Sequence, residues 1–421
     1  MKEVDLIIFT DCLVTCKGDR KPKSAEKMKD VGIIENGAVA VDDGIIVGVG
    51  TQNEIKSGFR AKMKPLGQKI DTKAFPILPG LVDSHTHPVF AGDRVREFIM
   101  RSGGATYQEI HAAGGGIQFT VNQTREAPTI GLYLKARMTL KRMLEHGSTT
   151  VEAKSGYGLN KEEEIRELDI IRDLDEDLPM DIIPTFMGAH SIPTEFKDNR
   201  GEFIRSIMEE MMPEVKKRNL AKFVDVFCEQ GAFTLDETRK ILESAKEMGF
   251  KTKLHAEEFS SMGSARMAGE MGATSVDHLL CISDDDIKAL ADTDTILTVM
   301  PGTLFFLDMK KYAPARKMID MGAKIALATD YNAGSCMSES MQMAMSLGVI
   351  AMKMTPEEAI NSATYNAAFA VGMSDAVGSI EVGKKADMIV MGINNYREIP
   401  YHFGVNLVKM VFKSGKVVVE R

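Results

Sequence analysis

The chain has 421 residues, of which 44% are hydrophobic and 27% charged, and its formal net charge at pH 7 is −8. This composition is that of an ordinary globular protein, and the negative charge provides no broad basic surface to attract a phosphate backbone. No stretch approaches the ~20 consecutive apolar residues of a membrane-spanning helix. We therefore expect a protein that binds neither nucleic acid nor a membrane.

The N-terminal residues lack the basic start and the apolar stretch of a secretion signal, so we expect a cytoplasmic protein. The cysteines fit that compartment, because they are five in number and form no CxxC pair. We expect them to be packing residues; they are Cys12, Cys16, Cys228, Cys281 and Cys336.

Both ends of the chain have the texture of short strands joined by tight turns. Apolar runs with Gly and Asp between them occupy residues 5–10 and 37–47, and similar runs return at 386–391 and 408–419. The pattern predicts one small composite β-sandwich domain, formed by residues 1–72 and 385–421 around a central domain at 73–384.

The central domain alternates apolar strand candidates with helical patterns, for example the helices at 132–146 and 162–174. Eight strands are expected, near residues 77–84, 147–153, 181–190, 222–230, 250–256, 274–279, 295–301 and 325–331. Eight such units indicate an α/β fold, a (β/α)8 TIM-like barrel with its chemistry at the C-terminal strand ends. The unpatterned stretch at 90–121 is expected to be a long functional loop.

Metal-binding side chains follow several of these strands. His85 and His87 lie two apart after an apolar run, so both imidazoles should project from one face of a strand. His255, His278 and Asp330 each end a later strand. Any one of them could be an ordinary buried, hydrogen-bonded residue, but five at strand ends favour a zinc or iron site. A metal of this kind lowers the pKa of a bound water from ~15.7 toward ~7.

This order of residues resembles that of the amidohydrolase superfamily. The resemblance implies a metal-dependent hydrolase. Many binuclear members carry a carboxylated lysine at the end of strand four, where this chain has Glu229, while Lys154 ends strand two. We therefore expect one zinc or iron ion per chain, with Glu229 in reserve as a ligand for a second.

A narrower resemblance covers nearly the whole chain and points to a family of cyclic amidases in histidine degradation. It is carried by residues 79–87, 89–94, 113–117, 154–159, 186–190, 254–258, 330–335 and 399–406. It implies metal ligation by His85, His87, His255 and Asp330, with His278 beside the metal. It also implies substrate contacts from Arg94, Tyr157, His190, Glu258, Asn332, Gly334 and Ser335. The chain departs from the family pattern at Glu257, Tyr331 and Ala333, where Asp, Phe and Pro are usual.

The implied reaction opens the ring of 4-imidazolone-5-propanoate with water to give N-formimidoyl-L-glutamate. Glu258, His278 and Asp330 are the expected catalytic residues: Glu258 moves protons, His278 stabilises the oxyanion if it is protonated, and Asp330 shares in the proton transfer. Arg94 is suited to hold the propanoate in a bidentate manner.

Simpler roles remain open for three of these residues. Arg94 could form a surface ion pair with Asp93 or Glu97, Tyr157 could cap a turn, and His190 could be a core histidine. Two other functions also remain open: another cyclic amidase or purine or pyrimidine deaminase of the same superfamily, and a non-catalytic barrel used for assembly. We expect a small-molecule substrate and a homodimer.

Overall fold

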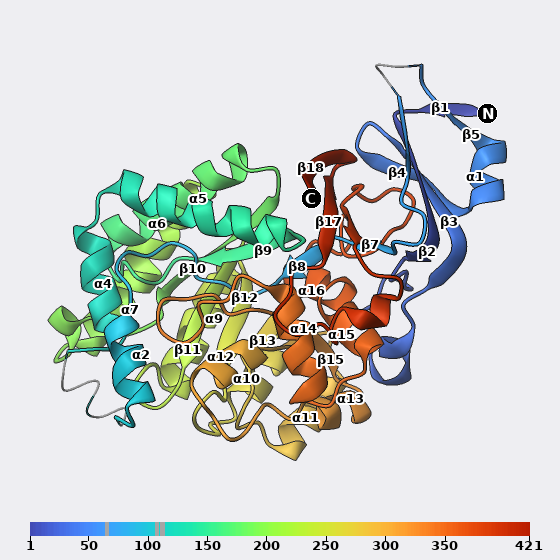
Figure 1. Cartoon of the computed structure of the whole chain (residues 1–421). Helices are drawn as coiled ribbons and strands as arrows, with labels where there is room; N and C mark the ends of the chain where they lie inside the picture. The colour runs from blue at the N-terminus through green and yellow to red at the C-terminus, as the bar shows by residue number, and fades with distance from the viewer. Residues whose placement is uncertain (64–66, 106–108, 110–113) are drawn as a thin grey trace.

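The computed structural model describes residues 1–63, 67–105, 109 and 114–421, in which a parallel barrel lies beside a smaller sheet (Figure 1). The barrel strands pair in chain order from β8 to β15, each parallel to the next. They are β8 (Leu81–Asp83), β9 (Ser148–Lys154), β10 (Asp181–Ala189), β11 (Phe223–Cys228), β12 (Lys251–Ala256), β13 (Ser275–His278), β14 (Ile296–Val299) and β15 (Lys324–Leu327). The α/β barrel with a separate sheet from the two termini is confirmed.

The first and last barrel strands meet just beyond their assigned ends. The Asp330 amide donates to the His85 carbonyl at 3.0 Å, and the His87 amide donates to the Tyr331 carbonyl at 2.8 Å. These hydrogen bonds join the segments that follow β8 and β15, so the C-terminal rim of the barrel is closed at His85 and His87.

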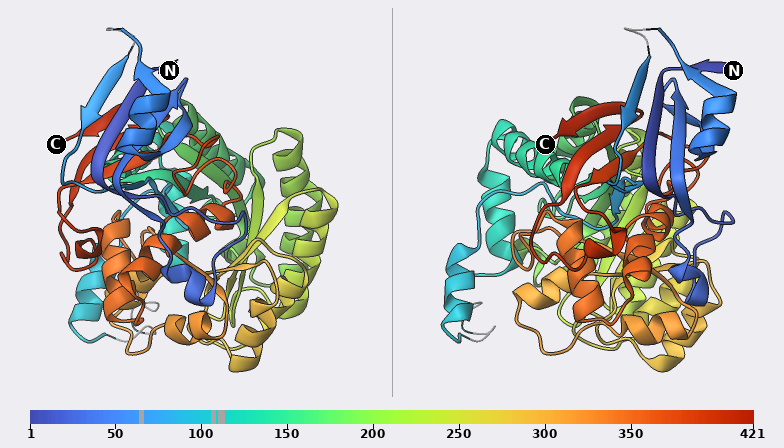
Figure 2. Two further views of the ribbon diagram at one scale, coloured as in Figure 1. Left: turned by 90° about the vertical axis from the view of Figure 1, so that its right-hand side faces the viewer. Right: turned by 45° about the vertical axis from the view of Figure 1, so that its right-hand side comes forward.

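Helices coat the outside of the barrel and alternate with its strands (Figure 2). The helices expected at 132–146 and 162–174 are α5 (Thr129–Glu145) and α6 (Lys161–Asp177). The Asn160 side chain caps α6 by accepting from the Glu163 amide, and three glutamates in its first turn favour the positive end of the helix. The other α-helices are α1 (Gln52–Gly58), α2 (Val95–Ser102), α4 (Ile117–Glu126), α7 (Arg200–Ser206), α8 (Met212–Lys217), α9 (Leu235–Glu247), α10 (Ser264–Glu270), α11 (Asp284–Ala291), α12 (Pro301–Phe306), α13 (Ala315–Asp320), α14 (Met341–Ile350), α15 (Pro356–Ser362) and α16 (Tyr365–Ala370).

The interpretation of residues 90–121 as one long loop was wrong. Helix α2 lies inside this stretch and α4 begins at Ile117. Glycines near both helices hid the helical pattern. Residues 106–108 and 110–113 of this stretch, Ala113 of the glycine-rich segment among them, lie outside the described residues.

The smaller sheet is built from both ends of the chain, and Figure 2 shows the N-terminal strands beside the C-terminal ones. Its strand order is β18-β17-β16-β7-β2-β3-β4, with β6 paired to β2, and a separate pair joins β1 and β5. The strands are β1 (Lys2–Val4), β2 (Leu6–Val14), β3 (Ile33–Asp42), β4 (Ile45–Thr51), β5 (Phe59–Ala61), β6 (Gln68–Asp71), β7 (Ile77–Pro79), β16 (Met388–Met391), β17 (Val408–Lys413) and β18 (Lys416–Glu420). The domain boundaries at 72/73 and 384/385 stay a prediction.

The single strand expected at 77–84 is in fact two strands that belong to different sheets. Strand β7 pairs with β16 in the smaller sheet, whereas β8 pairs with β9 in the barrel. Gly80 lies between them, and a Cβ atom there would come 2.1 Å from Oγ1 of Thr149. Glycine permits this close approach without a clash, at the point where the chain crosses from one sheet to the other.

An ionic cluster also joins the smaller sheet to the barrel. The Lys413 ammonium lies 2.6 Å from Asp387 Oδ2 and 2.7 Å from Asp181 Oδ2, and it donates to the Thr149 carbonyl at 3.2 Å. Asp181 begins barrel strand β10, far from the C-terminal rim. The cluster therefore stabilises the contact between the sheets without reaching the metal-binding motif.

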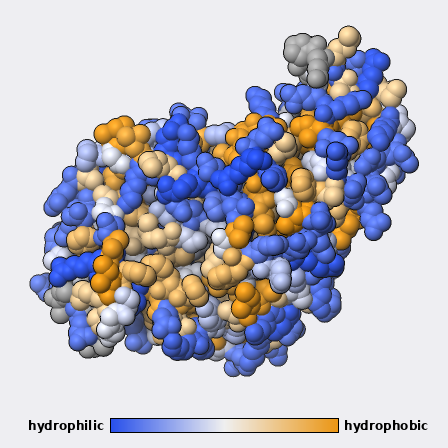
Figure 3. All heavy atoms as spheres, viewed as in Figure 1, coloured by the Kyte–Doolittle hydropathy of each residue, from blue (hydrophilic) through white to orange (hydrophobic). Residues whose placement is uncertain are grey.

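One face of the molecule is mixed in character. On the face shown in Figure 3, hydrophilic and hydrophobic residues are interspersed. Among the described residues, no helix combines the length and apolarity needed to cross a membrane.

Candidate active site

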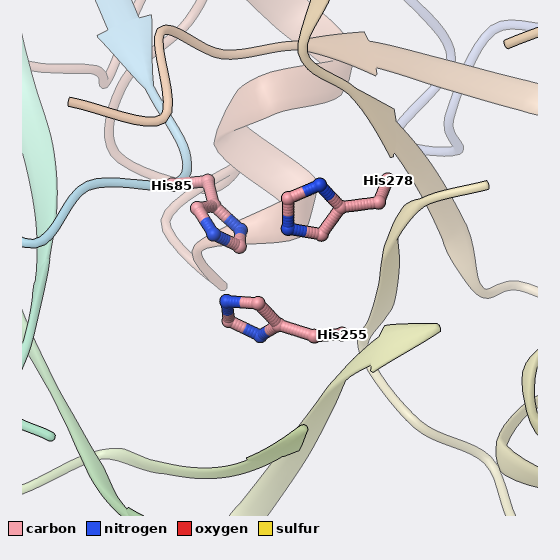
Figure 4. Close-up of side chains that lie close together, drawn as sticks. All are labelled: His85, His255 and His278. Atoms are coloured by element: carbon pink, nitrogen blue, oxygen red, sulfur yellow. The ribbon is translucent and has the colours of Figure 1, made fainter. Parts of the chain in front are cut away.

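The five metal-binding side chains expected from the sequence converge inside the C-terminal rim of the barrel. His85, His255 and His278 point toward one another from three different strand ends (Figure 4). All five side chains are buried. Two groups have ligand atoms that all lie within 4.8 Å of one another: His85 with His255 and His278, and His85 with His87 and Asp330.

The spacing of these atoms fits a metal ion. Nε2 of His87 lies 3.4 Å from Nε2 of His85 and 3.4 Å from Nε2 of His255. Oδ1 of Asp330 lies 3.5 Å from Nε2 of His85 and 3.8 Å from Nε2 of His87. Tetrahedral ligands at ~2.0–2.1 Å from a zinc ion are separated from one another by about 3.4 Å. The spacings of His87 with His85 and His255 match this value, and those of Asp330 with His85 and His87 are close to it.

The carboxylates of Asp277 and Asp225 determine which ring nitrogen of His85 and of His255 faces the other candidate ligands. Nδ1 of His85 donates to Asp277 Oδ2 at 2.7 Å, and Nδ1 of His255 lies 3.1 Å from Asp225 Oδ1. Because the carboxylates accept these protons, both Nε2 atoms carry lone pairs that are turned inward. Such buried lone pairs facing each other need a cation or a proton between them, so the side chains fit a divalent metal.

Lys154 and Glu229, the residues considered for a second metal, are engaged elsewhere. The Lys154 ammonium donates to Glu152 at 2.9 Å and to Asp225 at 2.7 Å. The Glu229 carboxylate accepts from the amides of Phe259 and Ser260 at 2.8 and 3.2 Å. Glu229 thus holds the loop that follows β12.

The expected catalytic residues Glu258 and His278 lie side by side. Their Oε1 and Nδ1 atoms are 3.7 Å apart. Burial, with Asp330 and Glu229 nearby, raises the pKa of Glu258 well above its usual range. Burial and the neighbouring His255 hold the pKa of His278 well below its usual range, so this ring is neutral and has a single N–H to donate. The protonated His278 considered from the sequence is therefore not favoured here.

Asp330 completes this group of residues. Burial raises its pKa to about 6, and the Thr303 hydroxyl donates to its Oδ2 at 2.7 Å. The backbone is strained at the site, since φ is +52° at Asp330 and +81° at His278. Non-glycine residues adopt such angles where the surrounding structure enforces them, often at functional sites.

His190 and Tyr157 extend the site beyond the metal-binding group. The His190 ring stacks on His87 at 5.1 Å between centroids and lies 5.4 Å from the Tyr157 ring. Its Nδ1 donates to the Gly156 carbonyl at 3.0 Å, which leaves Nε2 as an acceptor. Burial, then the neighbouring His255, lowers the pKa of His190 to about 3. Burial raises the pKa of Tyr157, so its hydroxyl stays protonated at neutral pH.

Arg94 faces the loop after β15, yet it already has an ionic partner. Its Nε and Nη2 atoms each donate to the Glu97 carboxylate at 2.8 Å. A Cβ added at Gly334 would lie 2.0 Å from Arg94 Nη1, so the guanidinium packs directly on that glycine. The ion pair with Glu97 weighed from the sequence is present, and it presents Arg94 on the side of the barrel that carries Asp330.

The loop after Asp330 is held by its own side chains. The Asn332 amide group donates to the Asp330 carbonyl at 2.7 Å and to Ser335 Oγ at 2.8 Å. Its carbonyl oxygen accepts from the amides of Gly334 and Ser335 at 2.7 and 2.8 Å. Asn332 and Ser335 therefore shape the loop, and their contact with a substrate stays a prediction.

The three departures from the family pattern have structural explanations. The Tyr331 hydroxyl lies 3.1 Å from Thr139 Oγ1 in the core, away from the metal-binding group. The Ala333 amide, which a proline would lack, lies near the Tyr157 hydroxyl and opposes the rise in its pKa that burial causes. The Glu257 carboxylate accepts from the amides of Met262 and Ser264 at 2.9 and 2.8 Å, next to the start of α10.

Sequence reasoning missed the residues that support the site. Asp225, Asp277 and Thr303 were not anticipated. A signal existed for the two aspartates, because a charged residue in the middle of an apolar barrel strand is unusual. No comparable signal marks Thr303, which reaches Asp330 from α12 only through the fold.

The profile of the amidohydrolase family matches residues 77–418, so the chain belongs to that family. It is 48% identical over 409 residues to the imidazolonepropionase of Alkaliphilus oremlandii (strain OhILAs), covering 97% of this chain and 96% of that protein. The imidazolonepropionase of Geobacillus kaustophilus (strain HTA426) is also 48% identical, with the same coverage. Within the amidohydrolases, the chain is therefore a member of the imidazolonepropionase family.

Solved structures with much lower identity share the fold. An adenosine deaminase from Xanthomonas campestris with bound zinc has a TM-score of 0.71 and 18% identity, covering 100% of this chain and 94% of that one. The guanine deaminase of E. coli has a TM-score of 0.73 and 14% identity, covering 99% of both chains. At these identities the likeness concerns the fold alone.

Proposed function

We propose that this protein hydrolyses the cyclic amide of 4-imidazolone-5-propanoate to N-formimidoyl-L-glutamate in histidine degradation. The observation that carries the proposal is the convergence of His85, His87, His255 and Asp330, each with a ligand atom within 3.8 Å of another member, in a chain 48% identical to imidazolonepropionases over nearly its full length.

We propose that His85, His87, His255 and Asp330 hold one zinc or iron ion, with His278 beside it. Two observations support this ligand set. Nε2 of His87 lies 3.4 Å from Nε2 of both His85 and His255, and a carboxylate contacts Nδ1 of each of these two histidines. When bound, the metal supplies an electrophile for the ring carbonyl and lowers the pKa of a water. The other steps depend on the chain's own residues.

Glu258 takes a proton from the attacking water and returns it to the ring nitrogen as the C–N bond breaks. Its raised pKa suits a carboxyl group that must hold a proton during turnover. The neutral His278, 3.7 Å from Glu258, donates its N–H to the developing oxyanion. Asp330, whose pKa burial raises to about 6, shares in the proton transfer.

Arg94 and the residues around it are proposed to hold the substrate. The free edge of the Arg94 guanidinium is suited to the propanoate, and Glu97 fixes its orientation. His190 and the protonated Tyr157 line the approach to His87 and can bind the polar edge of the ring. Gly334, with Asn332 and Ser335, closes the side next to Arg94.

The direct test measures turnover of 4-imidazolone-5-propanoate against a panel of aminopurines and aminopyrimidines. Ring opening of the former, with no ammonia released from the panel, is expected. Ammonia release without ring opening would instead assign the chain to a deaminase. Metal content of two variants tests the ligand set: His87→Ala should lose the metal, whereas His278→Ala should keep it.

A homodimer is part of the proposal. Helix α5 exposes Ile130, Leu134 and Met138, which lie four residues apart on one face of the helix. Such an apolar stripe favours burial against a second copy. Sedimentation analysis should give a dimer, and Leu134→Glu should shift it toward the monomer; a monomeric wild type would contradict this. A cytoplasmic location stays a prediction.

A further inference from the structure

The layer of side chains directly beneath the metal-binding group is charged. Barrel interiors are normally filled by branched apolar residues in layers. Here five charged side chains occupy that space, and none is exposed to solvent. They are Glu152 and Lys154 on β9, Asp225 on β11, Lys253 on β12 and Asp277 on β13.

The two lysines connect the three carboxylates. The Lys154 ammonium lies 2.7 Å from Oδ2 of Asp225, 2.8 Å from Oε2 of Glu152 and 4.0 Å from Oδ2 of Asp277. The Lys253 ammonium lies 3.0 Å from Glu152 and 3.7 Å from Asp277. It also donates to the Ser84 carbonyl at 2.8 Å, next to His85 in the chain.

The carboxylates in turn contact two metal-binding histidines. Asp225 accepts from the His255 backbone amide at 3.2 Å and lies 3.1 Å from Nδ1 of the same residue. Asp277 accepts from Nδ1 of His85 at 2.7 Å. Each histidine is thus linked through one carboxylate to a lysine that touches no metal-binding side chain.

We propose that Lys154 and Lys253 are positioning residues that preorganise the metal site, Lys154 through Asp225 for His255 and Lys253 through Asp277 for His85. Buried carboxylates are stable only when paired, and an ammonium group fixes where the carboxylate oxygens lie. A fixed oxygen keeps the proton on Nδ1, which leaves Nε2 free for the metal. The site is then assembled before any metal arrives.

The inference rests on the proposed ligand set, and its tests include readouts other than activity. In the metal-free wild type, ¹⁵N spectra of labelled histidine should show His85 and His255 with the proton on Nδ1. The chain has eight histidines, few enough to assign by substitution. Wild-type spectra with either ring mainly protonated on Nε2 would overturn the proposal without any variant.

Lys154→Met and Lys253→Met test each link separately. We expect the affinity for Zn²⁺, measured by competition with a chelator, to fall ~10–100-fold in each variant. Lys154→Met should disturb the His255 spectrum more than that of His85, and Lys253→Met should do the reverse. Glu152→Gln provides a milder change if a lysine variant fails to fold, and it should weaken Zn²⁺ binding in the same direction.

Lys413→Met is the matched control. Lys413 is also buried in an ionic cluster, but with Asp181 and Asp387 in the contact between the two sheets. It should lower the melting temperature and leave the affinity for Zn²⁺ within twofold of the wild type. The proposal fails if Lys154→Met and Lys253→Met keep wild-type affinity, or if Lys413→Met loses as much. A wild type that binds no metal would refute the proposed function instead.

Discussion

The Thr303 hydroxyl donates a 2.7 Å hydrogen bond to Oδ2 of Asp330, and the other oxygen of that carboxylate faces His85 and His87. Thr303 therefore fixes which oxygen faces the two histidines of the proposed metal site. Thr303→Val should lower metal affinity and activity by about tenfold, the lower end of the effect of such supporting residues. Thr298→Val is the control, because its buried hydroxyl has no hydrogen-bond partner among the described residues. Equal losses in both variants would contradict the assigned role.

Glu258→Gln should lower kcat by ~10²–10⁴-fold, the usual contribution of a positioned acid or base. Metal content should not change, because Glu258 belongs to neither group of metal-binding residues. Steady-state kinetics with metal analysis on the same sample checks both statements. A variant that keeps a third or more of the wild-type kcat would exclude Glu258 as the proton carrier.

Arg94→Lys should raise KM for 4-imidazolone-5-propanoate by about tenfold and change kcat less, because an ammonium cannot pair with Glu97 and the propanoate as a planar fork does. A substrate analogue that keeps the cyclic amide but lacks the propanoate group is the control. Wild type and variant should have the same KM for it. If only the melting temperature changes, Arg94 serves the ion pair with Glu97 alone.

Glu167→Gln should make stability less dependent on pH. Burial and the neighbouring Glu164 raise the pKa of Glu167 well above its usual range, while the Tyr157 amide donates to it at 3.3 Å. A folded-state pKa above the unfolded one means that stability is lost as pH rises from the unfolded pKa of ~4.3 toward the folded value. The difference in melting temperature, variant minus wild type, should therefore become more positive as the pH is raised from 5 to 8. A constant difference would show that Glu167 titrates normally.

Tyr331 and Thr139 form a hydrogen-bonded pair that can be tested by a double-mutant cycle. Tyr331→Phe should cost ~0.5–1.5 kcal/mol of unfolding free energy, and Thr139→Val ~1–3 kcal/mol because it leaves a buried hydroxyl unpaired. The double variant should cost less than the sum of the two. Activity should stay at the wild-type level, since the Tyr331 hydroxyl points into the core. Additive losses would mean that the two groups do not interact.

The barrel and the convergence of the five candidate side chains could be predicted because both follow from local patterns. Several of the buried parallel strands are apolar runs, and a polar residue at the end of such a run lies at the rim whatever the rest of the chain does. His255 and His278 were found in this way. The crossing at Gly80 was not found, because an apolar run reads the same whether it serves one sheet or two.

The partners of the site residues could not be predicted, since they come from distant parts of the chain. Asp277 meets His85 across 192 positions, and Lys154 meets Asp225 across 71. The pattern of residues along a single sequence indicates which residue types lie at strand ends. It does not indicate which carboxylate contacts which imidazole. The same limit applies to Glu97, whose pairing with Arg94 was only one of two surface alternatives.

The smaller sheet has a consequence for how the chain folds during synthesis. Strand β7 lies between β2 and β16 in the smaller sheet. The N-terminal strands of this sheet can therefore join its C-terminal strands only after β16, which begins at Met388, has left the ribosome. The barrel strands precede that point and can pair earlier. Until then the edge of β7 is open to pairing with another nascent chain. We therefore expect truncation before β16 to yield aggregated protein, even though every proposed metal ligand has already been synthesised.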